Sequence, residues 1–217
     1  MKLTYSFFYT FLLLYSNICH ASWLLNFGSG SSETSVSGDF PQPIVGGEIA
    51  NVREGNSTNL QLLFDFEFGG FETNELLIGI RNTSIDFNFD FVYTSANSSI
   101  RGGHQQYYQY LGPAILRRYQ PNWNTYIDPY VSVGGFLGFG INLPSGLGNV
   151  AGYTNSPTSL NLSGIANAGF ILSLGGSLYL DFAYEVSYFL LPLDEIDGVT
   201  VNTGLRKAYT VGFLNRF

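Results

Sequence analysis

The chain has 217 residues, enough for one domain of ordinary size or two small ones. Hydrophobic residues make up 45% and aromatic residues 17%, whereas charged residues supply only 12%, about half the usual share. This composition excludes charge-driven disorder, and the formal net charge of -7 argues against a basic nucleic-acid-binding surface. One cysteine cannot form an intrachain disulfide, and with two histidines it leaves few zinc ligands. We therefore expect no metal, no cofactor and no nucleic-acid partner.

The N-terminal segment, residues 1–21, predicts a secretory signal peptide. Lys2 supplies its positive charge, residues 7–15 form its apolar stretch, and Ala21 offers a small residue at the cleavage position. The apolar stretch is shorter than the ~20 residues that a membrane-spanning helix needs. Residues 22–57, rich in Gly, Ser, Asn and Pro, are expected to form a flexible arm, with room for a short strand at 44–52. The folded domain is then expected over residues 58–217.

Strict alternation of apolar and polar side chains begins after Asn59. Apolar residues occupy the even positions of 60–68, the odd positions of 85–93 and the even positions of 178–188, with mostly polar residues between them. A period of two predicts strands with one apolar and one polar face. In a membrane barrel the apolar face contacts lipid and the polar face lines the lumen, whereas in a soluble sandwich the apolar face packs into the core.

Strand length and composition favour the membrane barrel. Runs of about ten residues match a strand that crosses a bilayer at a tilt, and the polar faces mix acidic residues and arginine without lysine. A tight turn is expected at Thr83 and another at Gly175-Gly176. The fold class that we predict is all-β: an eight-stranded antiparallel up-and-down transmembrane β-barrel, with ten strands (recruiting 44–52) or a soluble sandwich as alternatives. The eight strands are expected at 59–69, 75–82, 84–94, 105–119, 125–140, 160–174, 177–190 and 205–217.

The C-terminal segment 209–217 resembles the last strand of bacterial outer-membrane proteins. Thr210, Gly212, Phe213 and Phe217 match its polar, glycine and aromatic positions, although Asn215 stands where an apolar residue is usual. The segment 128–140 is similar to the Pro-Tyr-Val-x-x-Gly-x-Gly strand of small opacity-type barrels, and 178–188 resembles their penultimate strand. The resemblance implies a multi-pass protein of the Gram-negative outer membrane. It also implies contact with lipid and lipopolysaccharide, and recognition of the four matching residues by the barrel assembly machinery.

The polar faces of the predicted strands gather charges of both signs. If they point inward, eight strands leave an interior only just wide enough for side chains, so these charges should form an ion-paired plug. The alternative is a narrow cation-preferring pore lined by the acidic excess. The residues predicted to face the lumen are Asp65, Glu67, Arg81, Asp86, Asp90, Asp128, Asp181, Glu185, Arg206 and Arg216, with one of Arg117 and Arg118.

Three classes of function follow from this architecture. The leading hypothesis is a non-catalytic barrel with a structural or adhesin-like role, which contacts an external ligand through loops at 95–104 and 141–159. The second is the cation channel, lined in particular by Asp86 and Asp90. The third is a lipid-modifying enzyme with His104 as its base, although Gln105 and Gln106 stand where a His-x-Ser motif would need a serine.

Overall fold

The computed structural model describes residues 22–39, 48–53, 55–66, 74–95, 98–121, 126–144 and 154–216; the predicted signal peptide lies outside them. In these ranges the chain forms strands only, and it contains no helix that is long and apolar enough to cross a membrane. The strands are β1 (Trp23–Ser37), β2 (Glu48–Arg53), β3 (Gly55–Phe66), β4 (Asn74–Ser95), β5 (Ser98–Tyr119), β6 (Ile127–Asn142), β7 (Asn155–Pro157), β8 (Leu160–Gly175), β9 (Leu178–Phe189), β10 (Asp194–Ile196) and β11 (Val199–Asn215).

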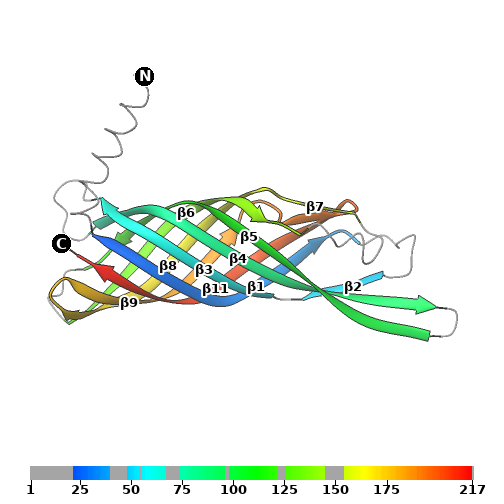
Figure 1. Cartoon of the computed structure of the whole chain (residues 1–217), viewed down its shortest axis with the longest axis horizontal. Coiled ribbons are helices and arrows are strands. Elements are labelled where there is room, and N and C mark those ends of the chain that lie inside the picture. The colour runs from blue at the N-terminus through cyan, green and yellow to red at the C-terminus, as the bar shows by residue number, and fades with distance from the viewer. Residues whose placement is uncertain are drawn as a thin grey trace, which may run out of the picture.

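Eight of these strands close into a ring. Neighbours pair antiparallel in the order β1-β3-β4-β5-β6-β8-β9-β11, and β11 pairs again with β1. Trp23, for example, pairs with Phe64 of β3 on one side and with Asn215 of β11 on the other. The strands run obliquely along an elongated barrel (Figure 1). The predicted fold class, an eight-stranded antiparallel up-and-down β-barrel, is confirmed.

The prediction of a flexible arm over residues 22–57 is wrong. β1 is one of the eight strands that form the ring, and β3 begins at Gly55. The barrel therefore starts at Trp23, well before residue 58. Glycine and serine disfavour strands and carry little hydropathy, which hides the alternation in this segment. Hydrogen bonding to β3 on one edge and β11 on the other holds β1 in place.

The predicted turn at Thr83 is also wrong. The two strands expected at 75–82 and 84–94 are one continuous strand, β4, which is 22 residues long and pairs with β5 over its whole length. The segment expected at 44–52 contributes β2, which pairs with the outer part of β4 and lies off the ring. The barrel ring therefore has eight strands, as predicted, and the ten-stranded alternative is wrong.

The links at one end of the barrel are short. β8 and β9 meet at Gly175-Gly176, where both residues have positive φ (102° and 64°), a conformation that glycine adopts without steric cost. At the other end, long segments connect β1 to β3 and β6 to β8. The small strand β10 pairs there with β11, and β7 pairs with β10. Outer-membrane barrels have short periplasmic turns and longer outside loops, which makes the second end the outer one.

The loop predicted at 95–104 is a strand instead. β4 extends to Ser95 and β5 begins at Ser98, so most of that segment belongs to a hairpin. The hairpin projects beyond the rest of the barrel at the outer end, with β2 alongside its base (Figure 1). Two paired strands thus extend beyond the barrel at the position where the sequence predicted an irregular loop.

Candidate functional site: the barrel interior and its outer extension

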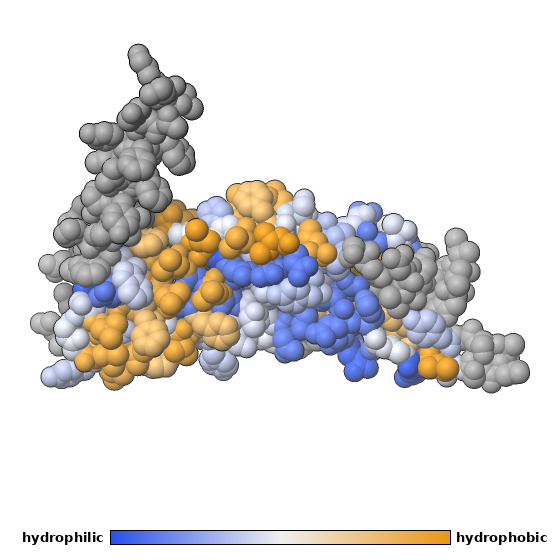
Figure 2. All heavy atoms as spheres, viewed as in Figure 1, coloured by the Kyte–Doolittle hydropathy of each residue, from blue (hydrophilic) through white to orange (hydrophobic). Residues whose placement is uncertain are grey.

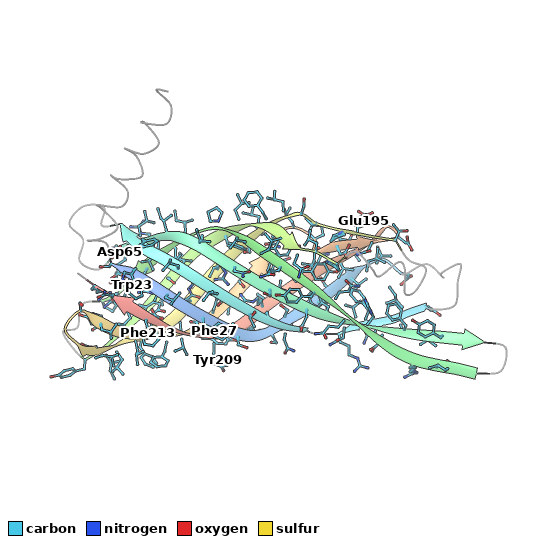
Figure 3. The ribbon with its side chains drawn as sticks, in the orientation of Figure 1. Trp23, Phe27, Asp65, Glu195, Tyr209 and Phe213 are labelled. Carbon is cyan, nitrogen blue, oxygen red and sulfur yellow. The ribbon has the colours of Figure 1, made fainter. Side chains whose placement is uncertain are left out.

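The periplasmic half of the barrel has an apolar outer surface. Tyr184 and Tyr209 contact each other on this surface with ring centroids 5.3 Å apart, and Phe170 and Phe182 stack at 5.3 Å. Figure 2 shows hydrophobic residues gathered over this half, and Figure 3 shows Phe27, Tyr209 and Phe213 along its outside. In water such a continuous band would be unfavourable, so it marks the lipid-facing surface. Its exposed members include Leu25, Phe27, Leu60, Leu62, Ile80, Ile115, Val131, Val133, Phe139, Leu160, Leu162, Phe170, Leu178, Tyr184, Tyr188, Tyr209, Val211 and Phe213.

The outer half reverses this arrangement. Along β4 the outward side chains change from Ile80, which is 60% exposed, to Asn82, Ser84 and Asp86. The inward side chains change from polar to apolar: Ile85, Phe87, Phe89 and Phe91 are all buried, and Phe87 packs edge-on against Tyr108. A polar outside and an aromatic inside describe a water-soluble barrel. The outer half therefore stands above the membrane.

The centre of the barrel interior holds a cluster around Glu185, which we call the central cluster. Its carboxylate accepts a bidentate pair of hydrogen bonds from Arg81, at 2.5 and 2.9 Å, and a third from Arg206 Nη1 at 2.7 Å. Asn59 Nδ2 donates a fourth bond at 3.0 Å, and Gln61 accepts one from Arg81 at 3.1 Å. All five side chains are buried, so the middle of the barrel is filled by charge-assisted hydrogen bonds.

A second cluster lies nearer the periplasmic end. Arg118 Nη2 donates to Asp181 at 2.8 Å, and its guanidinium stacks 4.2 Å from the ring of Tyr130, whose hydroxyl donates to the same carboxylate at 2.7 Å. Glu75 joins the cluster through ion pairs with Arg118, at 3.4 Å, and with Arg216. Asp65 also interacts electrostatically with Arg118, so each arginine of this cluster has acidic partners, as buried ionic groups require.

The outer end of the interior is closed by the small strands. Asp194 of β10 is buried and accepts a hydrogen bond from the Tyr108 hydroxyl at 2.7 Å and one from Asn155 Nδ2 at 3.4 Å. Burial raises the pKa of the Asp194 carboxyl above its ordinary value, and burial next to this carboxyl raises the pKa of Tyr108 as well. Tyr110 donates to the Thr158 carbonyl oxygen at 2.9 Å, which ties β5 to the same cap.

Two of the predicted lumen residues face outward instead. Asp86 and Asp90 lie on the outer surface of the hairpin, where Asp90 pairs with Arg53 at 2.6 Å and Asp86 accepts from Gln105 at 2.6 Å. The sequence prediction failed because it took the Phe face of this run to contact lipid, whereas that face packs inside the outer half. Among the predicted lumen residues, Arg81, Asp181, Glu185 and Arg206 are buried in the interior, while Asp65, Asp128 and Arg216 are half-buried or lie near its periplasmic end.

The remaining predicted site residues divide between the two surfaces. Of the two arginines on β5, Arg118 points inward and Arg117 is exposed outside. In the C-terminal strand Thr210 and Gly212 face the interior and Phe213 faces lipid. Glu67 and Phe217 lie outside the described residues.

Sequence reasoning missed several interior residues. Glu75 shares the odd-numbered face of β4 with Arg81, but apolar and polar residues alternate poorly over 75–82, so the pattern did not single it out. Tyr108 and Asp194 come together from segments 86 residues apart, and no sequence spacing signals their contact.

The interior offers little for catalysis. The His104 ring contacts Phe91 at 6.5 Å between centroids, and the part of the chain that the structure describes gives it no hydrogen bond to a serine or carboxylate. In the same residues, no group of three or more His, Cys, Asp or Glu side chains could hold a metal ion. What the arrangement does is fill the barrel: an ionic interior in the membrane and an aromatic core above it.

The closed eight-stranded ring and its lipid-facing band define a small outer-membrane β-barrel, a multi-pass protein of that membrane. Its fold is similar to the outer-membrane protein OprG from Pseudomonas aeruginosa, with a TM-score of 0.53 and 16% identity over 91% of this chain and 96% of that one. It is also similar to Neisserial surface protein A, with a TM-score of 0.52 and 11% identity over 90% and 97% of the two chains. No protein-family model matches the sequence, and no curated protein is detectably similar to it.

Proposed function

We propose that the chain is a non-catalytic outer-membrane barrel that contacts macromolecules outside the cell through the β4–β5 hairpin. The observation that supports this proposal is the length of the hairpin. β4 and β5 have 22 residues each, and they pair continuously from Asn74 with Tyr119 to Ser95 with Ser98. About 9–11 residues suffice to cross a bilayer. Roughly half of the hairpin therefore stands beyond the lipid, where it is accessible to an external partner.

The base of the hairpin is packed on its inner side and paired with a further strand. Phe87, Phe89 and Phe91 pack on its inner side, and β2 pairs with β4 on its outer part. Arg53 of β2 forms an ion pair with Asp90 across this junction. A surface that is already ordered loses less conformational entropy on binding than a flexible loop does, which favours affinity.

The filled interior argues against the channel alternative. The central cluster and the Asp181 cluster occupy the membrane part of an eight-stranded barrel, which has little room beyond its own side chains. Asp86 and Asp90, the acids that would have made such a pore cation-preferring, are outside the barrel. In planar bilayers the purified protein is expected to show no discrete single-channel currents; resolved currents would favour the channel.

A hairpin-trimming experiment tests the proposal. Replacing residues 93–100 by Asn-Gly joins Val92 to Arg101, which are already a register pair, and leaves the pairing of β2 intact. Cells displaying the full chain are applied to a glycan array and to surfaces coated with extracellular-matrix proteins. We expect binding above that of cells lacking the protein, and its loss in the trimmed variant.

The control variant replaces the segment 145–152 in the β6–β8 link by a Gly-Ser linker of equal length. Both variants must shift on unboiled denaturing gels, which shows that the barrel is closed. Binding that survives trimming but disappears in the control variant would move the site to the other loop. No binding by the full chain would contradict the proposal.

A further inference from the structure

The central cluster is unbalanced in charge. Two guanidinium groups, on Arg81 and Arg206, face the single carboxylate of Glu185, and all three side chains are 1% exposed. Arg81 satisfies its donors through Glu185, Gln61 and Thr83. In the Asp181 cluster below it, Arg118 and Arg216 face Asp181 and Glu75, and Asp65 also interacts electrostatically with Arg118. The local excess of positive charge is therefore confined to the centre.

Arg206 carries this excess. Its Nη1 donates to Glu185 at 2.7 Å and to Ser187 Oγ at 3.3 Å. Its Nε and Nη2 are buried, and the described residues provide neither of them with a hydrogen-bond partner. Leaving two donors of a buried cation unsatisfied is costly, and such groups in native proteins usually bind a water molecule or an ion.

Unpartnered hydroxyl groups lie on the inner faces of the strands next to Arg206. Ser32 is the direct register partner of Arg206 on β1, and its other partner, Gly55, is two residues from Ser57 on the same face of β3. Thr203 precedes Arg206 on the inner face of β11. Ser32, Ser57 and Thr203 are all buried, and their hydroxyl oxygens have no partner in the described part of the chain. Hydroxyl and guanidinium groups can both donate hydrogen bonds to an anion.

We propose that the barrel interior binds one small inorganic anion, of the size of chloride, between Arg206 and the hydroxyl groups of Ser32, Ser57 and Thr203. Water would satisfy the donors but would leave the second guanidinium uncompensated in a membrane-embedded interior, whereas an anion supplies both the acceptor and the charge. The narrow interior favours a monatomic ion over a phosphate.

The aromatic core of the outer half covers this position from the outside. Phe87, Phe89 and Tyr108 are buried above the central cluster, and β10 closes the outer end. The anion is therefore captured as the barrel closes, and it exchanges slowly with the medium afterwards. It acts as a structural counterion and is independent of the hairpin's role.

Bromide substitution tests the site. The full chain is refolded in detergent with sodium bromide as the only halide salt and crystallised, and the anomalous signal of bromine is measured. We expect one strong peak inside the barrel next to Arg206 Nε and Nη2, and its absence in Arg206→Gln, which restores a balance of one arginine to Glu185. A well-phased map of the bromide form without a peak at Arg206 would overturn the proposal and leave water as the ligand.

A solution measurement covers the case in which Arg206→Gln fails to fold. The heat-modification midpoint of the wild-type chain is compared after refolding in sodium chloride and in sodium gluconate at equal ionic strength. We expect a higher midpoint in chloride, reduced or lost in Ser32→Ala and Thr203→Val. The matched control is Ser132→Ala, a buried inward hydroxyl that accepts from Asn167 at 3.0 Å and should keep the chloride effect. Equal midpoints in the two salts for the wild-type chain would also contradict the proposal.

Discussion

The same strands carry opposite patterns in the two halves of the barrel. In the periplasmic half Phe170 and Phe182 point outward to lipid while Glu185 and Arg81 point inward. In the outer half Phe87 and its neighbours point inward and the polar side chains outward. The difference shows that alternation fixes the two faces of a strand but not which of them is inside; the surrounding medium decides that.

The largest effect is expected from the central cluster. Glu185→Ala leaves two buried guanidinium groups without a carboxylate, and removing one partner of a buried ion pair typically costs about 3–5 kcal/mol. The loss is measured as the change in free energy of unfolding in urea, in detergent or lipid vesicles. Asp86→Ala, on the outer surface of the hairpin, is the control and should change little. Equal losses for both would mean that the interior ion pairs do not stabilise the barrel.

A comparable loss is expected in the outer half when an aromatic residue is removed from its core. Phe87→Ala should cost about 3–5 kcal/mol, because it opens a cavity in a packed interior. Phe170→Ala removes the same atoms from a lipid-facing position, where lipid chains can fill the space, so its cost should be much smaller. The free energies of unfolding of the two variants are measured in urea under the same conditions. A larger loss for Phe170→Ala would contradict the assignment of the two halves.

Outward-facing positions should distinguish the halves by charge. Val133→Arg places a cation on the lipid-facing surface, where such a substitution costs about 2–4 kcal/mol near the midplane of the membrane. Ser35→Arg places the same side chain on the exposed surface of the outer half, opposite the uncharged Asn202, where a surface change is usually within about 0.5 kcal/mol. Refolding into lipid vesicles at several urea concentrations gives both values. Equal losses in the free energy of unfolding for the two variants would mean that the boundary between lipid and water does not lie at the edge of the apolar outer surface.

The smallest effect concerns pH and the outer cap. The pKa of the Asp194 carboxyl is raised in the folded chain, so between the ordinary value near 3.8 and the raised one the folded state binds more protons than the unfolded state. Stability from this group is therefore present at low pH and is lost as pH rises through that interval. Asp194→Asn, which keeps an acceptor for the Tyr108 hydroxyl, should flatten this slope. Unfolding midpoints measured between pH 3.5 and 7 test it, and an unchanged slope in the variant would assign the pH dependence elsewhere.

Local pattern predicted a large part of this fold. The period of two on β3 and β9 and the Gly175-Gly176 turn follow from residues close together in the sequence. The predicted number of eight strands is correct only because two errors cancel: β4 was divided in two and β1 was left out. The C-terminal resemblance and the charge-poor, aromatic composition together indicated the class of barrel. Each of these signals is local because a strand presents neighbouring residues to opposite faces whatever lies around it.

Only the tertiary structure decided which parts of the chain contact lipid, which contact water and which pack against other strands. β1 is a strand of the barrel because it pairs with β11 and so closes the ring, although its Gly- and Ser-rich sequence does not by itself predict a strand. Asp86 and Asp90 point outward because β4 continues past the membrane, so that its phenylalanines pack inside. Arg81 of β4 meets Glu185 of β9 across the barrel, although 104 residues separate them in sequence, and Arg206 joins from the neighbouring strand β11. The sequence by itself determined the alternation and the class; the closure of the ring and the height of the membrane decided which face became the interior.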